Sequence, residues 1–191
     1  MSSSGAVKNL RYKSPLYAES NKWQRSLNLQ ALDLFQMAFM PRDTSQLQFL
    51  DLGCGTGDFT RDFLLPRCLP CRRIVAVDGS EDMLSFARQN SGHANIEFDF
   101  LNISEDVGDF VLKYGTFDRV YSFFCLNWVS DQRKAMKNVC ELLSPSGECL
   151  LVFPAWSLTK MFWRKLAQMD RWKAFSNVSF PSEFNEGANC S

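Results

Sequence analysis

The sequence predicts an α/β fold with a doubly wound, mostly parallel sheet. Short apolar runs alternate with amphipathic stretches along most of the chain. The runs are almost continuously apolar, which is typical of parallel strands covered by helices on both faces. A glycine-rich loop directly follows the first run. Because strand–helix–strand crossovers are right-handed, these observations fix most of the topology.

The N-terminal region divides into an arm and a helix. Residues 1–22 are polar and rich in turn-forming residues, and Pro15 disfavours an early helix, so a loose arm is expected. Residues 23–40 combine helical spacing with extra apolar positions, which indicates a helix contacted on more than one side. The folded domain is expected over residues 23–175, followed by a polar tail over 176–191.

Five strands and four further helices are expected after this first helix. The strands are predicted over residues 48–52, 73–77, 95–100, 117–124 and 148–153. The helices are predicted over residues 56–65, from Ser80 onward, over 131–143 and over 158–175. Pro66 is expected to close the first of these helices, and Ser80 and Asp131 are expected to cap the next two.

The loop after the first strand carries three glycines, Gly53, Gly55 and Gly57. In open α/β sheets, ligands bind beyond the carboxyl ends of the strands, where this loop is predicted to lie. A dinucleotide fingerprint would need its third glycine at position 58, which is Asp58. Asp51 and Asp58 flank the turn, and two carboxylates disfavour a pyrophosphate and favour a ligand with positive charge. A tight strand-to-helix turn without a ligand is the alternative for this loop alone.

S-adenosylmethionine meets these requirements because it carries an ammonium and a sulfonium group and no phosphate. Asp78 ends the second strand and is predicted to accept hydrogen bonds from the ribose hydroxyls. Asn102 follows the third strand, and its amide oxygen can accept a hydrogen bond from the adenine amino group. Met83 can pack on adenine, although core packing is the more frequent role of methionine. The predicted cofactor-binding residues are Asp51, Gly53, Gly55, Gly57, Asp78, Gly79, Met83, Asn102 and Ile103.

Two motifs, LDLGCGTGDFT and AVDGSEDMLSFAR, resemble those of S-adenosylmethionine-dependent methyltransferases of the seven-strand, Rossmann-like type. The resemblance covers about residues 15–175. Further segments around residues 15–25, 122–133 and 149–153 are similar to the arthropod juvenile hormone acid and farnesoic acid O-methyltransferases. This resemblance implies methylation of a terpenoid or fatty carboxylic acid. It also implies that Gln24 and Trp128 act as the catalytic residues by addressing the substrate carboxylate.

The chemistry of carboxyl methylation suits these residue types. A carboxylate is already an anion at neutral pH, so its methylation needs no general base. It needs an in-line approach to the methyl group and partial removal of water. The Gln24 amide and the Trp128 indole N–H are neutral donors that can orient the carboxylate without neutralising it. Taken without the resemblance, Trp128 reads as a core aromatic residue and Gln24 as a surface residue.

The family normally ends in a sixth and a seventh strand, but only 16 residues follow Phe175. The final strands are therefore expected to be missing. Two alternatives to the acid methyltransferase remain: a methyltransferase of another small acceptor, and a truncated cofactor-binding form with little activity. The aromatic segment over residues 153–175 fits either an acyl pocket or ordinary helix–sheet packing.

Composition narrows the partners. The 191 residues include 21 Lys plus Arg and 21 Asp plus Glu, so there is no basic excess for nucleic-acid binding. The expected partner is a small apolar carboxylic acid, and no apolar run is long enough to span a membrane. The N-terminus lacks a secretory signal, so the seven cysteines are expected to be reduced in the cytoplasm. Cys68 and Cys71 form a CxxC pair, but His93 is the only histidine, so no metal site is expected.

Overall fold

The structure is a computed structural model that describes residues 14–154, 161–162, 165–166 and 168–171. Its centre is a five-stranded sheet in the order β3-β2-β1-β4-β5, and every neighbouring pair is parallel. The strands are β1 Gln48–Leu52, β2 Arg73–Asp78, β3 Ile96–Phe100, β4 Phe117–Phe123 and β5 Leu143–Val152. The predicted doubly wound parallel sheet is confirmed, and the first four strands fall within one residue of their predicted ends.

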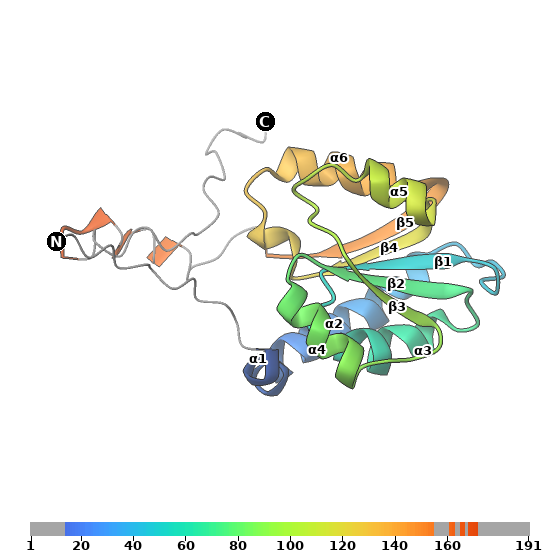
Figure 1. The fold of residues 1–191 in the computed structure, drawn as a ribbon, viewed down its shortest axis with the longest axis horizontal. Helices are drawn as coiled ribbons and strands as arrows, with labels where there is room; N and C mark the ends of the chain where they lie inside the picture. The colour runs from blue at the N-terminus through green and yellow to red at the C-terminus, as the bar shows by residue number, and fades with distance from the viewer. Residues whose placement is uncertain (1–13, 155–160, 163–164, 167, 172–191) are drawn as a thin grey trace.

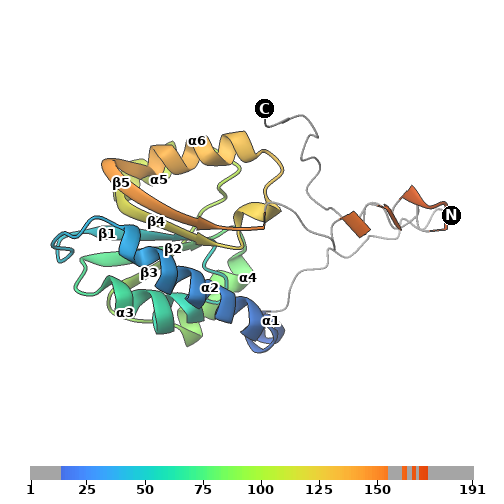
Figure 2. The same ribbon diagram turned by 180° about the vertical axis from the view of Figure 1, so that it is seen from behind.

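Helices cover both faces of the sheet (Figures 1 and 2). One face carries α2 Lys22–Phe35, α3 Leu65–Cys68 and α4 Glu81–Asn90, and the other carries α5 Gly108–Tyr114 and α6 Gln132–Leu142. The chain winds outward from β1 through β2 to β3, then returns to place β4 on the other side of β1. The order therefore reverses between β1 and β4, which is where ligands bind in such sheets.

Two apolar layers hold the helices on the sheet. Val75, Val120 and Leu142 belong to the layer under α5 and α6, and Phe49, Leu64 and Tyr121 belong to the layer under α2 and α3. Most of these side chains are fully buried. Each buried aliphatic or aromatic side chain stabilises the fold by about 1.5–3 kcal/mol relative to its exposed state.

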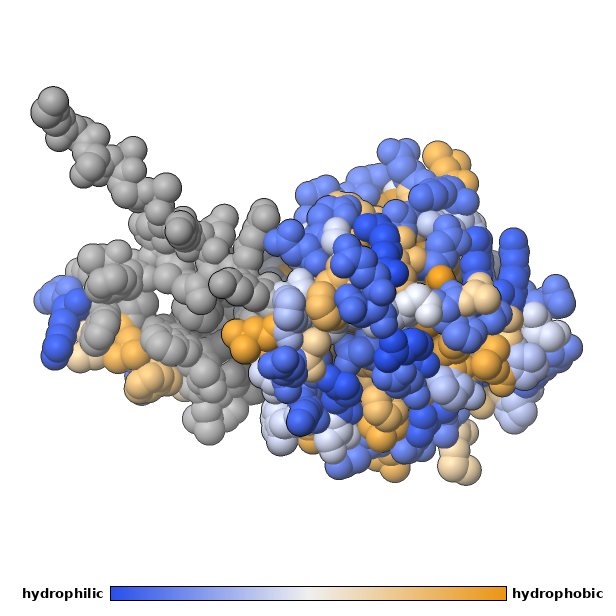
Figure 3. All heavy atoms as spheres, turned by 60° about the horizontal axis from the view of Figure 1, so that its bottom comes forward, coloured by the Kyte–Doolittle hydropathy of each residue, from blue (hydrophilic) through white to orange (hydrophobic). Residues whose placement is uncertain are grey.

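The outer faces of the helices are mostly polar. Figure 3 shows the side of the molecule at the bottom of Figure 1, where apolar side chains are scattered among hydrophilic ones. Within the residues that the structure describes, no helix combines the length and the apolar character needed to cross a bilayer.

The prediction that Pro15 disfavours a helix was wrong. A helix, α1, runs over Ser14–Ser20 with Pro15 in its first turn, where the missing N–H has no helical partner to lose. The described residues of the expected arm are therefore helical, apart from the turn at Asn21 between α1 and α2. Residues 1–13 and 172–191 lie outside the described residues, so the limits of the arm, the domain and the tail stay predictions.

The helix after the glycine loop also differs from its prediction. It passes through a π-helical turn, η2 Thr60–Leu64, and continues into α3, which contains Pro66 near its start. A wide turn before a proline is one way in which a helix accommodates the missing N–H and the bulk of the ring. Pro66 therefore lies inside the helix and does not close it.

The remaining elements complete the comparison. The helix α5, between β3 and β4, was not predicted, and β5 begins at Leu143, five residues earlier than expected, beside a register shift in β4. The Ser80 and Asp131 side chains cap α4 and α6 as predicted, accepting from the backbone N–H groups of Met83 and Lys134. Most of the helix expected over residues 158–175 lies outside the described residues.

Candidate active site

A cavity of about 640 Å³ opens at the carboxyl ends of β1, β2 and β4. Its walls come from the glycine loop, the start of α4, α1, the start of α2 and the short helix η3 Leu126–Trp128. Its described lining includes nine of the eleven predicted site residues: Gln24, Gly53, Gly55, Asp78, Gly79, Met83, Asn102, Ile103 and Trp128. Sequence positions more than 100 residues apart thus meet in one cavity.

Gly53 is held where no other residue would fit. Its φ of +84° belongs to the left-handed region, and a Cβ there would lie 2.3 Å from the Cβ of Cys125. The Gly53 backbone N–H donates to the carbonyl of Val77 at 2.8 Å. The loop is therefore drawn tightly against both the end of β2 and the segment after β4.

Asp78 is the fixed acid of the cavity. Its carboxylate accepts hydrogen bonds from the backbone N–H groups of Gly55 and Ser80, each at 2.9 Å. Burial raises the pKa of Asp78, and the two N–H donors oppose this rise. Because both donors are backbone groups, the carboxylate is held in one orientation beside the cavity.

Asp51 and Gly57 are the two predicted site residues that do not line the main cavity. Asp51 is buried, accepts a hydrogen bond from the Thr60 hydroxyl at 2.6 Å, and faces an adjoining polar cavity of about 30 Å³. Burial raises the pKa of Asp51 to about 7. Gly57 instead makes room for Phe98, whose ring would lie 2.7 Å from an added Cβ.

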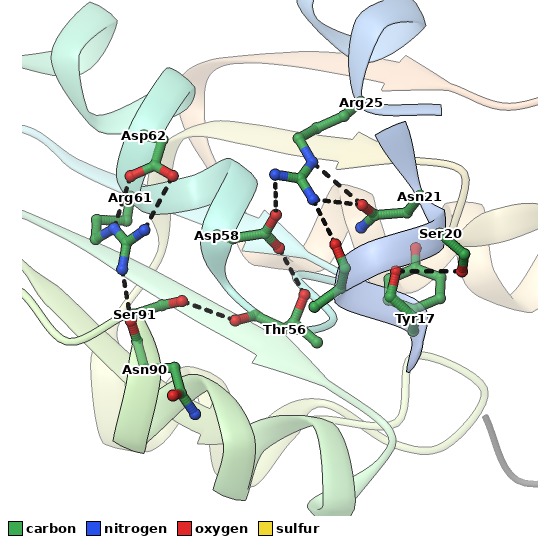
Figure 4. Close-up of polar contacts among 11 residues, drawn as sticks. Tyr17, Ser20, Asn21, Arg25, Thr56, Asp58, Arg61, Asp62, Asn90 and Ser91 are labelled. Atoms are coloured by element: carbon green, nitrogen blue, oxygen red, sulfur yellow. Dashed lines mark hydrogen bonds and ion pairs between the residues drawn. The ribbon is translucent and has the colours of Figure 1, made fainter. Parts of the chain in front are cut away.

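Asp58 does not offer a free charge to a ligand. Its carboxylate forms an ion pair with Arg25 of α2 at 2.8 Å and also accepts a hydrogen bond from Thr56 (Figure 4). It lines the small cavity and is absent from the described lining of the main one. The expectation that both flanking carboxylates favour a cationic ligand is therefore corrected, since Arg25 compensates the charge of Asp58.

Neutral donors also line the cavity. The Gln24 side-chain amide donates to the Tyr17 hydroxyl at 3.4 Å, and burial raises the pKa of Tyr17, so its hydroxyl stays protonated. Trp128 is 51% exposed at the cavity. With the Asn127 amide turned so that it donates to the carbonyl of Phe124, its oxygen accepts from the Trp128 indole N–H at 3.3 Å.

Several cavity residues were not predicted individually. They include Tyr17, Asn21, Trp23, Phe124 and Cys125. All five lie in or beside the two segments, around residues 15–25 and 122–133, that carry the closer family resemblance. Phe124 also has a φ of +54°, a strained conformation for a residue with a side chain and one that is frequent at functional sites.

The charge of the cavity is distinctive. Asp78 is the only charged side chain among the described residues that line it, and no Lys or Arg is among them. The described residues contain no cluster of three His, Cys, Asp or Glu side chains able to hold a metal ion. Cys68 and Cys71 are buried, and Cys68 contacts the Tyr121 hydroxyl in the core beneath α3.

A family model described as a methyltransferase domain matches residues 49–147, which include the glycine loop, β1 from Phe49 onward and the strands β2 to β4. The chain belongs to this family. A solved DhpI–SAM–HEP complex has the same fold, with a TM-score of 0.59 and 19% identity over 89% of this chain and 76% of that one. The fold is therefore the Rossmann-like methyltransferase fold.

Two curated methyltransferases are similar in sequence. Juvenile hormone acid O-methyltransferase of Bombyx mori is 31% identical over 84% of this chain and 56% of that protein. The protein of the same description from Drosophila melanogaster is 32% identical over 85% of this chain and 55% of that protein. The chain thus spans little more than half the length of these relatives.

Proposed function

We propose that this methyltransferase transfers the methyl group of S-adenosylmethionine to the carboxylate of an apolar acid, such as a terpenoid or fatty acid. The observation that carries this proposal is the presence of two unlike sets of groups in one cavity. One set is the fixed carboxylate of Asp78, and the other is the neutral donors Tyr17 and Gln24 together with the Trp128 ring. The first set suits a nucleoside with positive charge, and the second suits a carboxylate.

The residues present fit S-adenosylmethionine. Asp78 keeps acceptor positions free beside its two backbone donors, as recognition of a ribose diol requires. Asn102 and Ile103 lie just after β3, where they suit the edge of an adenine, and Met83 suits its face. The lack of Lys and Arg among the described lining residues disfavours a ligand with phosphates. When bound, S-adenosylmethionine supplies an electrophilic methyl group.

Two neutral donors, Gln24 and Tyr17, can orient the carboxylate of the acid. The Gln24 amide has a second N–H besides the one directed at Tyr17, and the Tyr17 hydroxyl can donate as well. Such donors aim one carboxylate oxygen while leaving its negative charge for the attack. The apolar side chains Trp23, Phe124 and Val129 line the same cavity and suit the hydrocarbon part of the acid. They also keep water from the nucleophile.

The reaction needs no base, and the described cavity offers no histidine for one. His93 is exposed in the turn before β3, where its ring accepts a hydrogen bond from the backbone N–H of Asn95. The names of the two insect relatives also support an acid as acceptor. Phenol or amine acceptors, which must lose a proton, fit this cavity less well.

Two measurements test the proposal. Calorimetric titration with S-adenosylmethionine measures cofactor binding, and transfer of a labelled methyl group to farnesoic acid measures activity, with farnesol as the matched acceptor that lacks the carboxylate. We expect binding of the cofactor and turnover of the acid but not of the alcohol. Absence of cofactor binding would overturn the whole proposal.

Turnover of a different acceptor would replace the acid by another small molecule. Cofactor binding without turnover of any acceptor in an acid panel would instead support the alternative of a cofactor-binding form with little activity.

A further inference from the structure

Arg25 connects the N-terminal helices to the glycine loop through a set of polar contacts (Figure 4). Its guanidinium forms the ion pair with Asp58 at 2.8 Å and donates to the carbonyl of Ala18 at the same distance. It also donates twice to the Asn21 side chain. One side chain of α2 therefore ties together α1, the junction before α2 and the loop that follows β1.

The contacts continue through the loop to the end of α4. The Thr56 hydroxyl donates to Asp58, and the carbonyl of Thr56 accepts from the Ser91 hydroxyl at the end of α4 at 2.9 Å. Thr56 and Ser91 are buried. Thr56 thus connects the loop end of the network to α4, whereas its other end, α1 and the start of α2, lines the cavity.

Arg25 lies beside residues that line the main cavity, although it does not line that cavity itself. It follows Gln24 directly, and its partner Asn21 lines the cavity together with Tyr17. The side chains of Arg25 and Asp58 are 24% and 16% exposed, so the ion pair is screened less than a fully exposed one. The planar guanidinium fork binds several oxygens in fixed directions, which a lysine cannot do.

We infer that the Arg25–Asp58 pair is a latch that couples occupation of the glycine loop to the position of α1 and α2. The inference rests on the proposed function, in which the loop holds the cofactor and these helices hold the acid. A ligand that orders the loop fixes Asp58, which fixes Arg25 and with it Gln24 and Asn21. Two sites that share such an element bind their ligands with a coupling free energy, and the effect is reciprocal. Arg25 is accordingly a positioning residue, not a catalytic one.

A second ion pair provides a matched control. Arg67 of α3 forms an ion pair with Asp33 of α2 at 2.7 Å. Like the Arg25–Asp58 pair, this pair joins an arginine to an aspartate and attaches α2 to another part of the fold. Neither residue is among the described lining of either cavity. Loss of this pair weakens the attachment of α2 at its far end but leaves the latch intact.

The test compares Arg25→Gln, Arg25→Lys, Asp58→Asn and the control Arg67→Gln with the original chain. Hydrogen exchange of peptides spanning Ser14–Phe35 is measured with and without S-adenosylhomocysteine, the product form of the cofactor. We expect the ligand to slow exchange of this segment about fivefold in the original chain and in Arg67→Gln. The slowing is expected to be lost in Arg25→Gln and Asp58→Asn and only partly kept in Arg25→Lys.

Kinetics give the second readout. Arg25→Gln is expected to raise the KM of the acid about fivefold or more, with a smaller change in kcat. The double variant Arg25→Gln/Asp58→Asn is expected to be no worse than Arg25→Gln alone, because the single variant already removes the pair.

The latch is overturned if the original chain binds S-adenosylhomocysteine but Arg25→Gln keeps the ligand-dependent slowing, or if Arg67→Gln loses it equally. Failure of the original chain to bind S-adenosylhomocysteine would instead contradict the proposed function itself.

Discussion

The backbone N–H of Gly55 donates to the carboxylate of Asp78 at 2.9 Å, so the glycine loop and the end of β2 hold each other in place. The acid that suits a ribose is therefore part of the same unit as the loop that approaches the ligand. This arrangement links the cofactor side of the cavity to the pairing of β1 with β2.

Asp78→Asn should weaken the binding of S-adenosylmethionine at least tenfold. The amide loses the charge that strengthens hydrogen bonds from ribose hydroxyls, and each such bond to a charged group contributes about 1.5–3 kcal/mol. Calorimetric titration measures the effect. Asp131→Asn, at the N-cap of α6, is the matched control and should bind as the original chain does, since Asn caps helices as well as Asp. Equal affinity of the two variants for S-adenosylmethionine would show that Asp78 does not contribute to cofactor binding.

Gly53→Ala should destabilise the fold by about 1–3 kcal/mol and abolish cofactor binding, because its Cβ would collide with Cys125 and its φ is positive. Thermal unfolding followed by circular dichroism measures the loss of stability. Gly79→Ala is the control, since the nearest atom to its added Cβ is the carbonyl oxygen of Leu101 at 3.9 Å. A Gly53→Ala protein as stable as Gly79→Ala would contradict the described packing of the loop.

Gln24→Ala and Trp128→Ala should each reduce turnover of the acid about tenfold or more, while the affinity for S-adenosylmethionine changes little. Both side chains line the cavity from α2 and η3, whereas Asp78 lines it from the end of β2. Gln30→Ala, an exposed glutamine on the same helix α2, is the control and should keep full activity. A parallel loss of cofactor affinity would show that Gln24 and Trp128 do not act on the acid alone.

Asp51 should make stability depend on pH between about 4 and 7. Its pKa is about 7 in the folded chain and near 4 when unfolded, so the folded chain binds the extra proton in this range. The free energy of unfolding should therefore decrease as pH rises from 4 to 7, by a few kcal/mol, relative to Asp51→Asn. Urea unfolding of both proteins at several pH values measures the difference. A difference that does not vary with pH would show that Asp51 titrates normally.

The strands and the glycine loop were predictable because their signals are local. The runs around Leu50 and Val75 are apolar on both faces, and burial of both faces leaves a parallel strand as the simplest explanation. The signals of Pro15 and Pro66 are local too, but their effect depends on the position in the helix, which the sequence does not mark.

The candidate site was predictable only in part. Asp78 and the glycines follow from their order along the chain, whereas the contact of Gly53 with Cys125 joins residues brought together by the sheet. The pairing of Arg25 with Asp58 is of the same kind, and it changed the interpretation of the carboxylates flanking the loop. The sequence therefore suggested an uncompensated negative charge at Asp58, because it does not show that Arg25 lies beside it.

The place of β4 beside β1 has a consequence for folding during synthesis. Phe49 of β1 faces Arg119 of β4 in the sheet, so the central strand waits for a segment synthesised some 70 residues later. Until that segment leaves the ribosome, one edge of β1 has no strand partner, and the segment after β4 that packs against Gly53 is absent. Pairing across such a distance is slow, and a bare edge invites aggregation. Nascent chains arrested before β4 should therefore bind chaperones readily.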